Sequence, residues 1–221
     1  LESGGLLALS GNAGISGIGR VTTASNRELI LYAVGNLDLS VPLGGFSGGV
    51  TKSGAGTLTL GAGNTFTGAV TVNEGTLKFG GGDFSVAPNL TMQLLGGNLD
   101  LNGTVQSFNN IQASTGTLAV NDLFAANTAG DVINTSATEA TLALVGSGTS
   151  TFRGRIGNGN VSDSDIAVMR STAAGATTDW NIYGDNTYTG ATLFNGGRVI
   201  MQDTGRLLGT SSIELSNSTL L

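Results

Sequence analysis

The segment from Val50 to Gly80, VTKSGAGTLTLGAGNTFTGAVTVNEGTLKFG, decides the fold. It contains three short runs in which apolar and polar residues alternate, at 57–60, 70–72 and 76–79. Glycine- and asparagine-rich breaks separate these runs. Alternation with a period of two, bounded by turn residues, predicts short β-strands joined by tight turns. No helical stripe with a period of 3.6 residues is present, so we expect the segment to be β.

The same pattern returns 122 residues later. The hexapeptide NTFTGA at 64–69 falls without a gap on NTYTGA at 186–191. The apolar positions Leu58 and Leu60 fall on Trp180 and Ile182. We interpret this as internal duplication of a structural unit, over about 7–101 and 142–221, within one continuous domain spanning 1–221.

The spacing of similar runs predicts the architecture. Runs of the form small-x-Leu-x-apolar recur with steps of 19, 22, 19 and 24 residues, counted from their second residues Thr57, Thr76, Asn98, Thr117 and Thr141. A step of roughly 20 residues is the length of one coil of a parallel β-helix. In that fold each coil pairs with the coils above and below it, about 4.8 Å away. We therefore predict an all-β, right-handed parallel β-helix, or β-solenoid, of about ten coils.

Further strands are expected between these runs and beyond them. They fall at 5–9, 28–32, 36–39, 90–94, 97–101, 116–120, 140–144, 166–168 and 218–221. Two stretches are less regular: 121–139, which is interpreted as loop plus strand, and the polar loop 157–165.

Composition narrows the function classes. Glycine supplies 37 of 221 residues, whereas charged residues make up 11% against about 25% in typical domains. The net charge is −6 and no basic stripe is present, so nucleic-acid binding is not expected. The absence of Cys and His excludes disulfides, thiol catalysis, His-based proton transfer and the usual zinc sites, and no cofactor is expected. No apolar run approaches about 18 residues, so membrane insertion of this segment is not expected.

The two ends of the sequence suggest a partner. The chain opens with Leu1 and no signal peptide is visible, which is expected of a mature product or of a piece of something longer. Both ends are apolar and strand-like, at Leu6–Leu7 and Leu220–Leu221, and neither resembles a polar cap. Because open coil ends invite pairing, we expect further coils of the same or identical chains to stack end to end, up to a homo-polymer.

The run KSGAGTLTL at 52–60, followed by NTFTG at 64–68 and EGTL at 74–77, resembles the passenger-associated β-strand repeat of bacterial autotransporters. The likeness is near-complete at 50–80 and looser at 168–200, where Gly75-Thr76-Leu77 becomes Gly197-Arg198-Val199. The resemblance implies a right-handed parallel β-helix that is secreted and exposed at the cell surface. It marks secretion and shape, and it does not mark activity.

The recurring Asn-Thr-aromatic-Thr-Gly motif is interpreted as structural rather than as a binding signature. Asn and Gly tolerate left-handed turns, and we expect the aromatic ring to stack on an adjacent coil and the threonines to favour strands.

Acidic residues are the other candidates. Asp163 and Asp165, with Asn158 and Asn160, offer oxygen ligands for calcium, but the loop lacks the Gly and distal Glu of an EF-hand and the repeat of calcium β-rolls. It is interpreted as a solvated loop, and no metal site is predicted. Asp38 and Asp100 hold equivalent places in two Gly-Asn-Leu-Asp-Leu runs and are expected to face solvent.

Three functions are compatible with these patterns. A non-catalytic structural segment of an extracellular stalk or filament is favoured, with no catalytic residue. The alternative is an adhesin, in which exposed Thr/Asn faces or the 157–165 loop bind a host protein or a surface glycan. A carbohydrate-active enzyme would need paired carboxylates with a basic group. The nearest combination is Asp163 and Asp165 with Arg153, Arg155 and Arg170.

Overall fold

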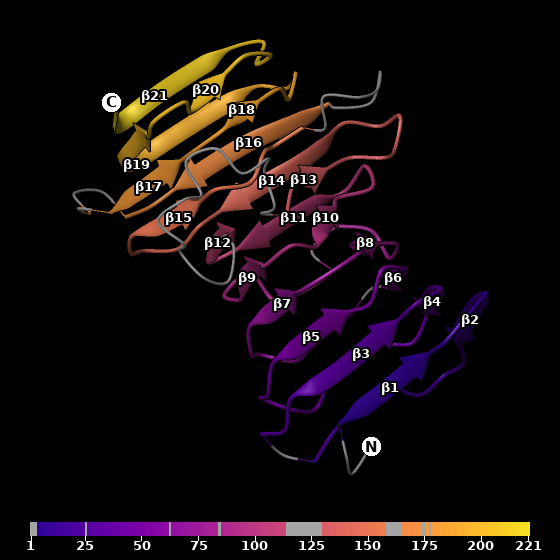
Figure 1. Ribbon diagram of the computed structural model, residues 1–221. Helices are drawn as coiled ribbons and strands as arrows, with labels where there is room; N and C mark the ends of the chain where they lie inside the picture. Colours follow the sequence, from indigo (N-terminus) through magenta and orange to yellow (C-terminus); the bar gives the residue numbers. More distant parts are fainter. Residues whose placement is uncertain are drawn as a thin grey trace.

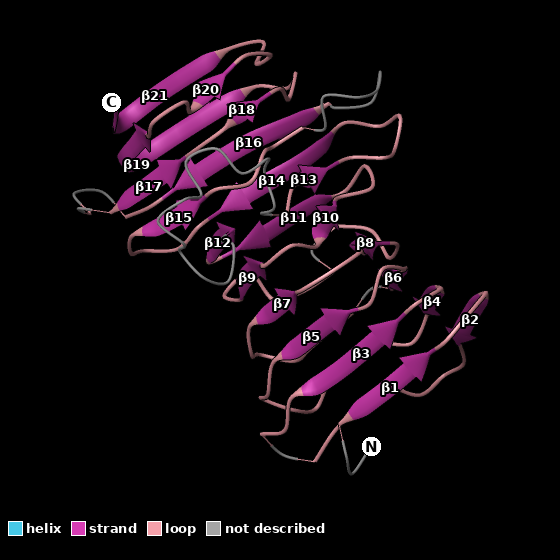
Figure 2. Ribbon diagram, in the orientation of Figure 1, coloured by secondary structure: helices cyan, strands magenta, loops and turns pink. Residues whose placement is uncertain are grey.

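The computed structural model describes residues 4–24, 26–61, 63–83, 85–113, 130–157, 165–173, 176 and 178–221. The chain winds as a β-solenoid of about eight turns, with coils of about 22 residues stacked from the N-terminus to the C-terminus (Figure 1). Every strand pairing is parallel, and the described residues contain strands and turns without a helix (Figure 2). Nothing in the described ranges is therefore a helix of the length and apolar character needed to cross a membrane. The predicted all-β parallel β-helix is confirmed.

Each coil contributes to three faces of the solenoid, which the chain visits in the same order. The first face comprises β1 (Gly5–Ala8), β3 (Leu29–Ala33), β5 (Val50–Ser53), β7 (Val70–Val72), β9 (Thr91–Leu94), β12 (Asn110–Ala113), β15 (Ser150–Phe152), β17 (Asp179–Ile182) and residues 198–201 of β19 (Thr192–Met201). The second face comprises β2 (Asn12–Ile15), β4 (Asn36–Leu39), β6 (Thr57–Leu60), β8 (Thr76–Phe79), β10 (Asn98–Asp100) and β13 (Val132–Ile133), then β18 (Asp185–Asn186) and β20 (Arg206–Leu207). The third face comprises β11 (Val105–Phe108), β14 (Ala140–Leu144), β16 (Ile166–Ser171), residues 192–195 of β19 and the first half of β21 (Ile213–Leu220).

Apolar side chains stack in columns inside the solenoid. On the second face the in-register column runs through Leu37, Leu58, Leu77, Leu99 and Val132. All five are buried. Alternation along each strand produces this result, because every second side chain points inward. Burial of each leucine contributes about 1.5–3 kcal/mol, so stacking of coils is the main source of stability.

Glycines line the corner between the first and second faces. A Cβ atom added at most of these glycines would overlap the carbonyl oxygen of the glycine one coil earlier. The pairs are Gly35 on Gly11, Gly56 on Gly35, Gly75 on Gly56, Gly130 on Gly97 and Gly154 on Gly130. Close approach of successive backbones therefore explains the glycines at this corner, whereas turn conformation explains many of the others, since fifteen of the described glycines have a positive φ.

The predicted strands agree closely with the structure, and the number of coils does not. The predicted runs at 57–60, 70–72 and 76–79 are β6, β7 and β8, in that order and with the same bounds. Coils 50–108 repeat every 19–22 residues, but Ala113 pairs with Phe152, which is 39 residues away. Because some coils are this long, the chain forms about eight coils rather than the predicted ten. The predicted strand at 116–120 lies outside the described residues.

The two similar segments occupy different faces. Residues 57–60 form β6 on the second face, whereas the aligned residues 179–182 form β17 on the first face. Likewise 70–72 lie on the first face and 192–194 on the third. A shift of 122 residues along the chain therefore corresponds to five coils less one face, so each aligned strand lies one face earlier in the second segment than in the first. The duplication itself stays a prediction.

Candidate functional site

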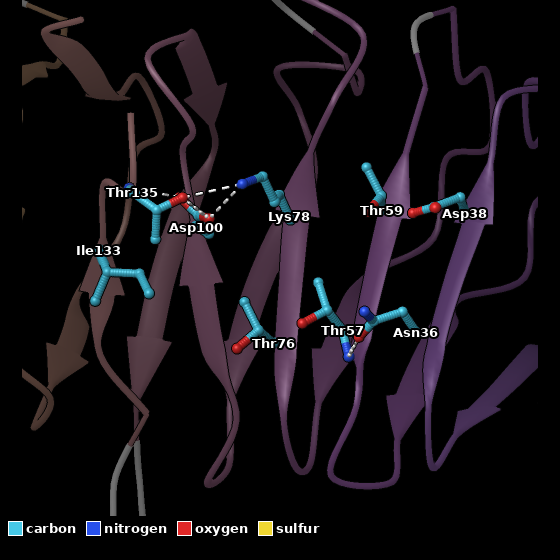
Figure 3. A pocket seen from close by; sticks show the side chains of 9 residues that line it. All are labelled: Asn36, Asp38, Thr57, Thr59, Thr76, Lys78, Asp100, Ile133 and Thr135. Atoms are coloured by element: carbon cyan, nitrogen blue, oxygen red, sulfur yellow. Dashed lines mark hydrogen bonds and ion pairs between the residues drawn. The ribbon is translucent and has the colours of Figure 1, made fainter. Parts of the chain in front are cut away.

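A polar groove crosses the outer surface of the second face (Figure 3). Its volume is about 390 Å³, and it runs over β4, β6, β8, β10 and β13. The lining side chains are those of Asn36, Asp38, Thr57, Thr59, Thr76, Lys78, Asp100, Ile133 and Thr135. Except for Thr135, which follows β13, they occupy the outward positions that alternate with the buried leucines. The strand period that builds the core therefore also builds this polar surface.

At one end of the groove Asp100 is held by several donors. It is 2% exposed, so the prediction that it faces solvent is wrong. Thr135 donates from its Oγ1 to Oδ2 at 2.6 Å and from its backbone N–H to Oδ1 at 3.1 Å, and Asn102 N–H donates to Oδ1 at 2.9 Å. Lys78 Nζ lies 3.4 Å from Oδ2 (Figure 3). The segment after β13 covers this carboxylate, an arrangement that depends on the following coil and that the local pattern does not contain.

The other end of the groove is open. Asp38 is exposed, as predicted, and lies beside Thr59 (Figure 3). Asn36 donates from Nδ2 to Asn12 Oδ1 at 3.1 Å and accepts from the Thr57 N–H at 3.3 Å. This end offers threonine hydroxyls, amide groups and one carboxylate, which suit hydrogen bonding to a hydroxyl-rich ligand.

The two groove carboxylates are too far apart for paired acid–base chemistry. Asp38, Thr59, Lys78 and Asp100 are register partners on four successive strands. Three strand steps of about 4.8 Å separate the two aspartates by about 14 Å. Glycosidase carboxylates lie about 5–9.5 Å apart. The groove therefore has the composition of a binding surface rather than of a hydrolytic centre.

The other acidic candidates do not assemble into a site in the described part of the chain. Asp165 accepts a hydrogen bond from Thr189 Oγ1 at 2.6 Å, while Asp163, Asn158 and Asn160 lie outside the described residues. Within the described ranges no group of three or more His, Cys, Asp or Glu side chains could hold a metal ion.

The three arginines considered with that loop make different contacts. Arg153 places its guanidinium 4.2 Å from the ring centroid of Tyr183. Arg155 forms a salt bridge with Asp131 at 2.7 Å. The hydrogen bond to Asp131 is the main cause of the raised pKa of Arg155. Arg170 is buried inside the solenoid. They do not form one basic edge.

A ladder of alternating charges continues the second face beyond the groove, and sequence reasoning missed it. Its members are Asp131, Arg155, Asp185 and Arg206. Arg206 Nε lies 2.8 Å from Asp185 Oδ1, and Asp185 also contributes to the raised pKa of Arg155. The residues are 21–30 positions apart in the sequence, so only the register of the coils reveals the alternation. Exposed pairs of this kind contribute about 0–1 kcal/mol each.

The recurring asparagine binds three coils together. Asn64 Oδ1 accepts from Leu43 N–H at 2.8 Å in the preceding coil, and its Nδ2 donates to Gly61 O at 2.7 Å and to Ser85 O at 2.8 Å in the next coil. Asn186, its equivalent, likewise accepts from the Ile156 N–H of the preceding coil. Its Nδ2 donates within its own coil to the carbonyls of Tyr183 and Gly184, and to Arg206 O in the next coil.

Neither asparagine has a positive φ, so tolerance of a left-handed turn is not what this position requires of asparagine. The glycines of the motif, Gly68 and Gly190, also lack positive φ, and each lies against the backbone of the preceding coil, where a Cβ would overlap it. The prediction for the aromatic residue is confirmed at Phe66, which stacks on Phe46 with centroids 5.7 Å apart. Tyr188 is buried and shares a hydrogen bond of 2.7 Å with Thr192 Oγ1.

The segments that carry this bridge match a known family model. The passenger-associated-transport-repeat model matches residues 50–79 and 179–201. Both segments are passenger-associated-transport-repeats. The match at 179–201 covers about one coil, and the match at 50–79 covers more than one, because Val50 pairs with Val70 and Thr57 with Thr76 inside it. Both segments include the asparagine bridge, and the repeat indicates a passenger domain of autotransporter type, a class of secreted or cell-surface proteins. No curated protein and no solved structure has significant similarity to the chain.

Proposed function

We propose that this passenger segment is a non-catalytic stalk of an extracellular, cell-surface protein of autotransporter type. The observation that carries the proposal is the stacking of coils from β1 to β21, which includes the two matched repeats and is bound together by backbone ladders and asparagine bridges. Such a stack suits a rod that holds other parts of a protein away from the cell. The wide separation of Asp38 and Asp100 further supports a role without catalysis.

Further coils, from the same or an identical chain, are the partners in this proposal. β21 pairs only with β19 among the described strands, and the inward column that contains Phe194 ends at Leu215, which is 46% exposed. Ile213 on the same strand is 45% exposed. An additional parallel coil would cover both side chains and extend the ladder.

Electron microscopy and sedimentation velocity test this proposal. The isolated segment should appear as a rod about 40 Å long, and end-to-end multiples of that length should increase with concentration. Leu215→Lys should suppress the multiples, because it places a charge in the stacking surface. Met169→Lys is the matched control, because Met169 is exposed on the third face rather than at an end. A species that stays monomeric at all concentrations would exclude end-to-end pairing of identical chains.

An adhesin is the second candidate, and the polar groove supports it. Hydroxyl, amide and carboxylate groups in an open groove suit a neutral glycan chain. Binding of the purified segment to a glycan array, followed by Thr59→Lys, tests this candidate. The variant should abolish binding by filling the groove, whereas Thr151→Lys on the first face should not. An array without binding would remove the glycan-binding candidate.

A further inference from the structure

Arg170 lies in the interior of the solenoid with most of its donors unused. It is the fifth residue of β16, and its register partners are Leu144 on β14 and Phe194 on β19. The side chain has no exposed surface. Its Nη2 reaches Thr178 Oγ1 at 3.4 Å, and its Nε and Nη1 have no hydrogen-bond partner.

Two neighbouring side chains also have unused donors. The Arg170 guanidinium carbon lies 5.9 Å from the ring centroid of Trp180, and Ser150 is the register partner of Trp180 one coil earlier. Trp180 is fully buried and Ser150 is 2% exposed. Among the described residues, six buried side-chain atoms lack a partner, and four of them belong to these three residues: Arg170 Nε, Arg170 Nη1, Trp180 Nε1 and Ser150 Oγ.

Among the residues that the structure describes, no carboxylate neutralises this cation through a hydrogen bond. Asp179 is the nearest negative charge that acts on Arg170, but its two oxygens accept from Arg198 Nε at 2.7 Å and Nη2 at 2.8 Å. The other buried cation, Lys52, is arranged differently, because its Nζ donates to the carbonyl oxygens of Ser53, Gly54 and Glu74. A buried charge without such partners is strongly destabilising, which indicates that something else compensates for it.

We propose that a small inorganic anion, chloride or another halide, binds between coils beside Arg170, Trp180 and Ser150. All four unpartnered atoms can donate a hydrogen bond. A water molecule at this place would accept from only two of them, and of these four atoms only Ser150 Oγ could accept one of its two protons. A halide accepts from several donors and also neutralises the guanidinium charge. The ion would lie between β16 on the third face and β17 on the first face, and its hydrogen bonds would connect these two strands.

Anomalous diffraction locates the ion directly. Crystals of the wild-type chain soaked in sodium bromide should show a bromine peak within hydrogen-bonding reach of Arg170 Nε and Trp180 Nε1. A map without a peak at this place, or one occupied by water, would overturn the proposal. This measurement needs no variant, so a folding defect cannot obscure it.

Thermal unfolding supplies the second test. The melting temperature is measured while chloride replaces gluconate at constant ionic strength, because gluconate is too large to enter an interior site. The wild-type melting temperature should rise with chloride, because the ion binds the folded state only. Arg170→Met should lose that response, and Trp180→Phe should raise the half-saturating chloride concentration about tenfold, the effect of one lost hydrogen bond to a charged group. Arg206→Met is the matched control, because it removes an exposed arginine that pairs with Asp185 and leaves the charges around Arg170 in place, and it should respond as the wild type does. Equal chloride responses in wild type and Arg170→Met would contradict the proposal.

Discussion

Asn64 connects three coils through a single buried side chain, and the passenger repeat preserves this arrangement at Asn186. Asn64→Ala would leave the Leu43 N–H and the Gly61 carbonyl without partners, whereas the Ser85 carbonyl would keep only its 3.3 Å hydrogen bond from the backbone N–H of residue 64. We expect a loss of about 2–4 kcal/mol in the free energy of unfolding, measured by urea denaturation. Asn73→Ala is the control, because Asn73 donates only to the exposed Ser53 Oγ and should cost less than about 0.5 kcal/mol. Equal losses in the two variants would refute the bridging role.

Lys52 gives the stability of the chain a pH dependence. Burial lowers the pKa of Lys52 to about 8, while the charge of Glu74 opposes the shift. The unfolded chain, with a Lys pKa of 10.5, therefore binds more protons above pH 8 than the folded chain does. The stability contributed by Lys52 should rise between pH 8 and 10.5, by up to about 3 kcal/mol.

Urea midpoints measured from pH 7 to 10 test this dependence. The wild type should gain more stability over this range than Lys52→Met, which lacks the titrating group but retains the other ionisable groups. Parallel pH profiles for the two proteins would show that Lys52 titrates normally in the folded state.

At the scale of elements, the glycine corner controls how closely successive coils approach. A Cβ at position 56 would overlap the Gly35 carbonyl, and Gly56 has no positive φ, so the effect of Gly56→Ala is steric. We expect Gly56→Ala to destabilise the fold by about 1–3 kcal/mol or more through displacement of strands β4 and β6. Gly19→Ala is the control, because a Cβ at Gly19 meets nothing and φ is not positive there. Calorimetric melting temperatures should separate the two variants.

The elements that could be predicted from sequence are those that depend on local alternation. The runs at 57–60, 70–72 and 76–79 matched their strands because inward and outward positions are set by a period of two. Burial of Asp100 could not be predicted, because Thr135 reaches it from 35 residues away. The role of Asn64 was also missed, since asparagine in a turn is compatible with several conformations and its three partners lie in three coils.

For the whole molecule, each coil contacts only its neighbours, so stability should vary along the rod. β21 and β1 have a partner on one side among the described strands, whereas β7 and β9 have partners on both. Native-state hydrogen exchange should therefore show the slowest amides in the central coils and faster exchange toward both ends. Uniform protection from β1 to β21 would indicate instead that the chain opens as one cooperative unit.

The one-face offset between the two passenger repeats changes what a similar sequence can present to the outside. The two segments share the buried bridge and the glycine contact, but their outward side chains lie on different faces of the solenoid. A recognition surface on the outward side of one segment would therefore face a different direction from the same positions of the other. Similar sequences can in this way meet different surroundings while their interior contacts stay alike.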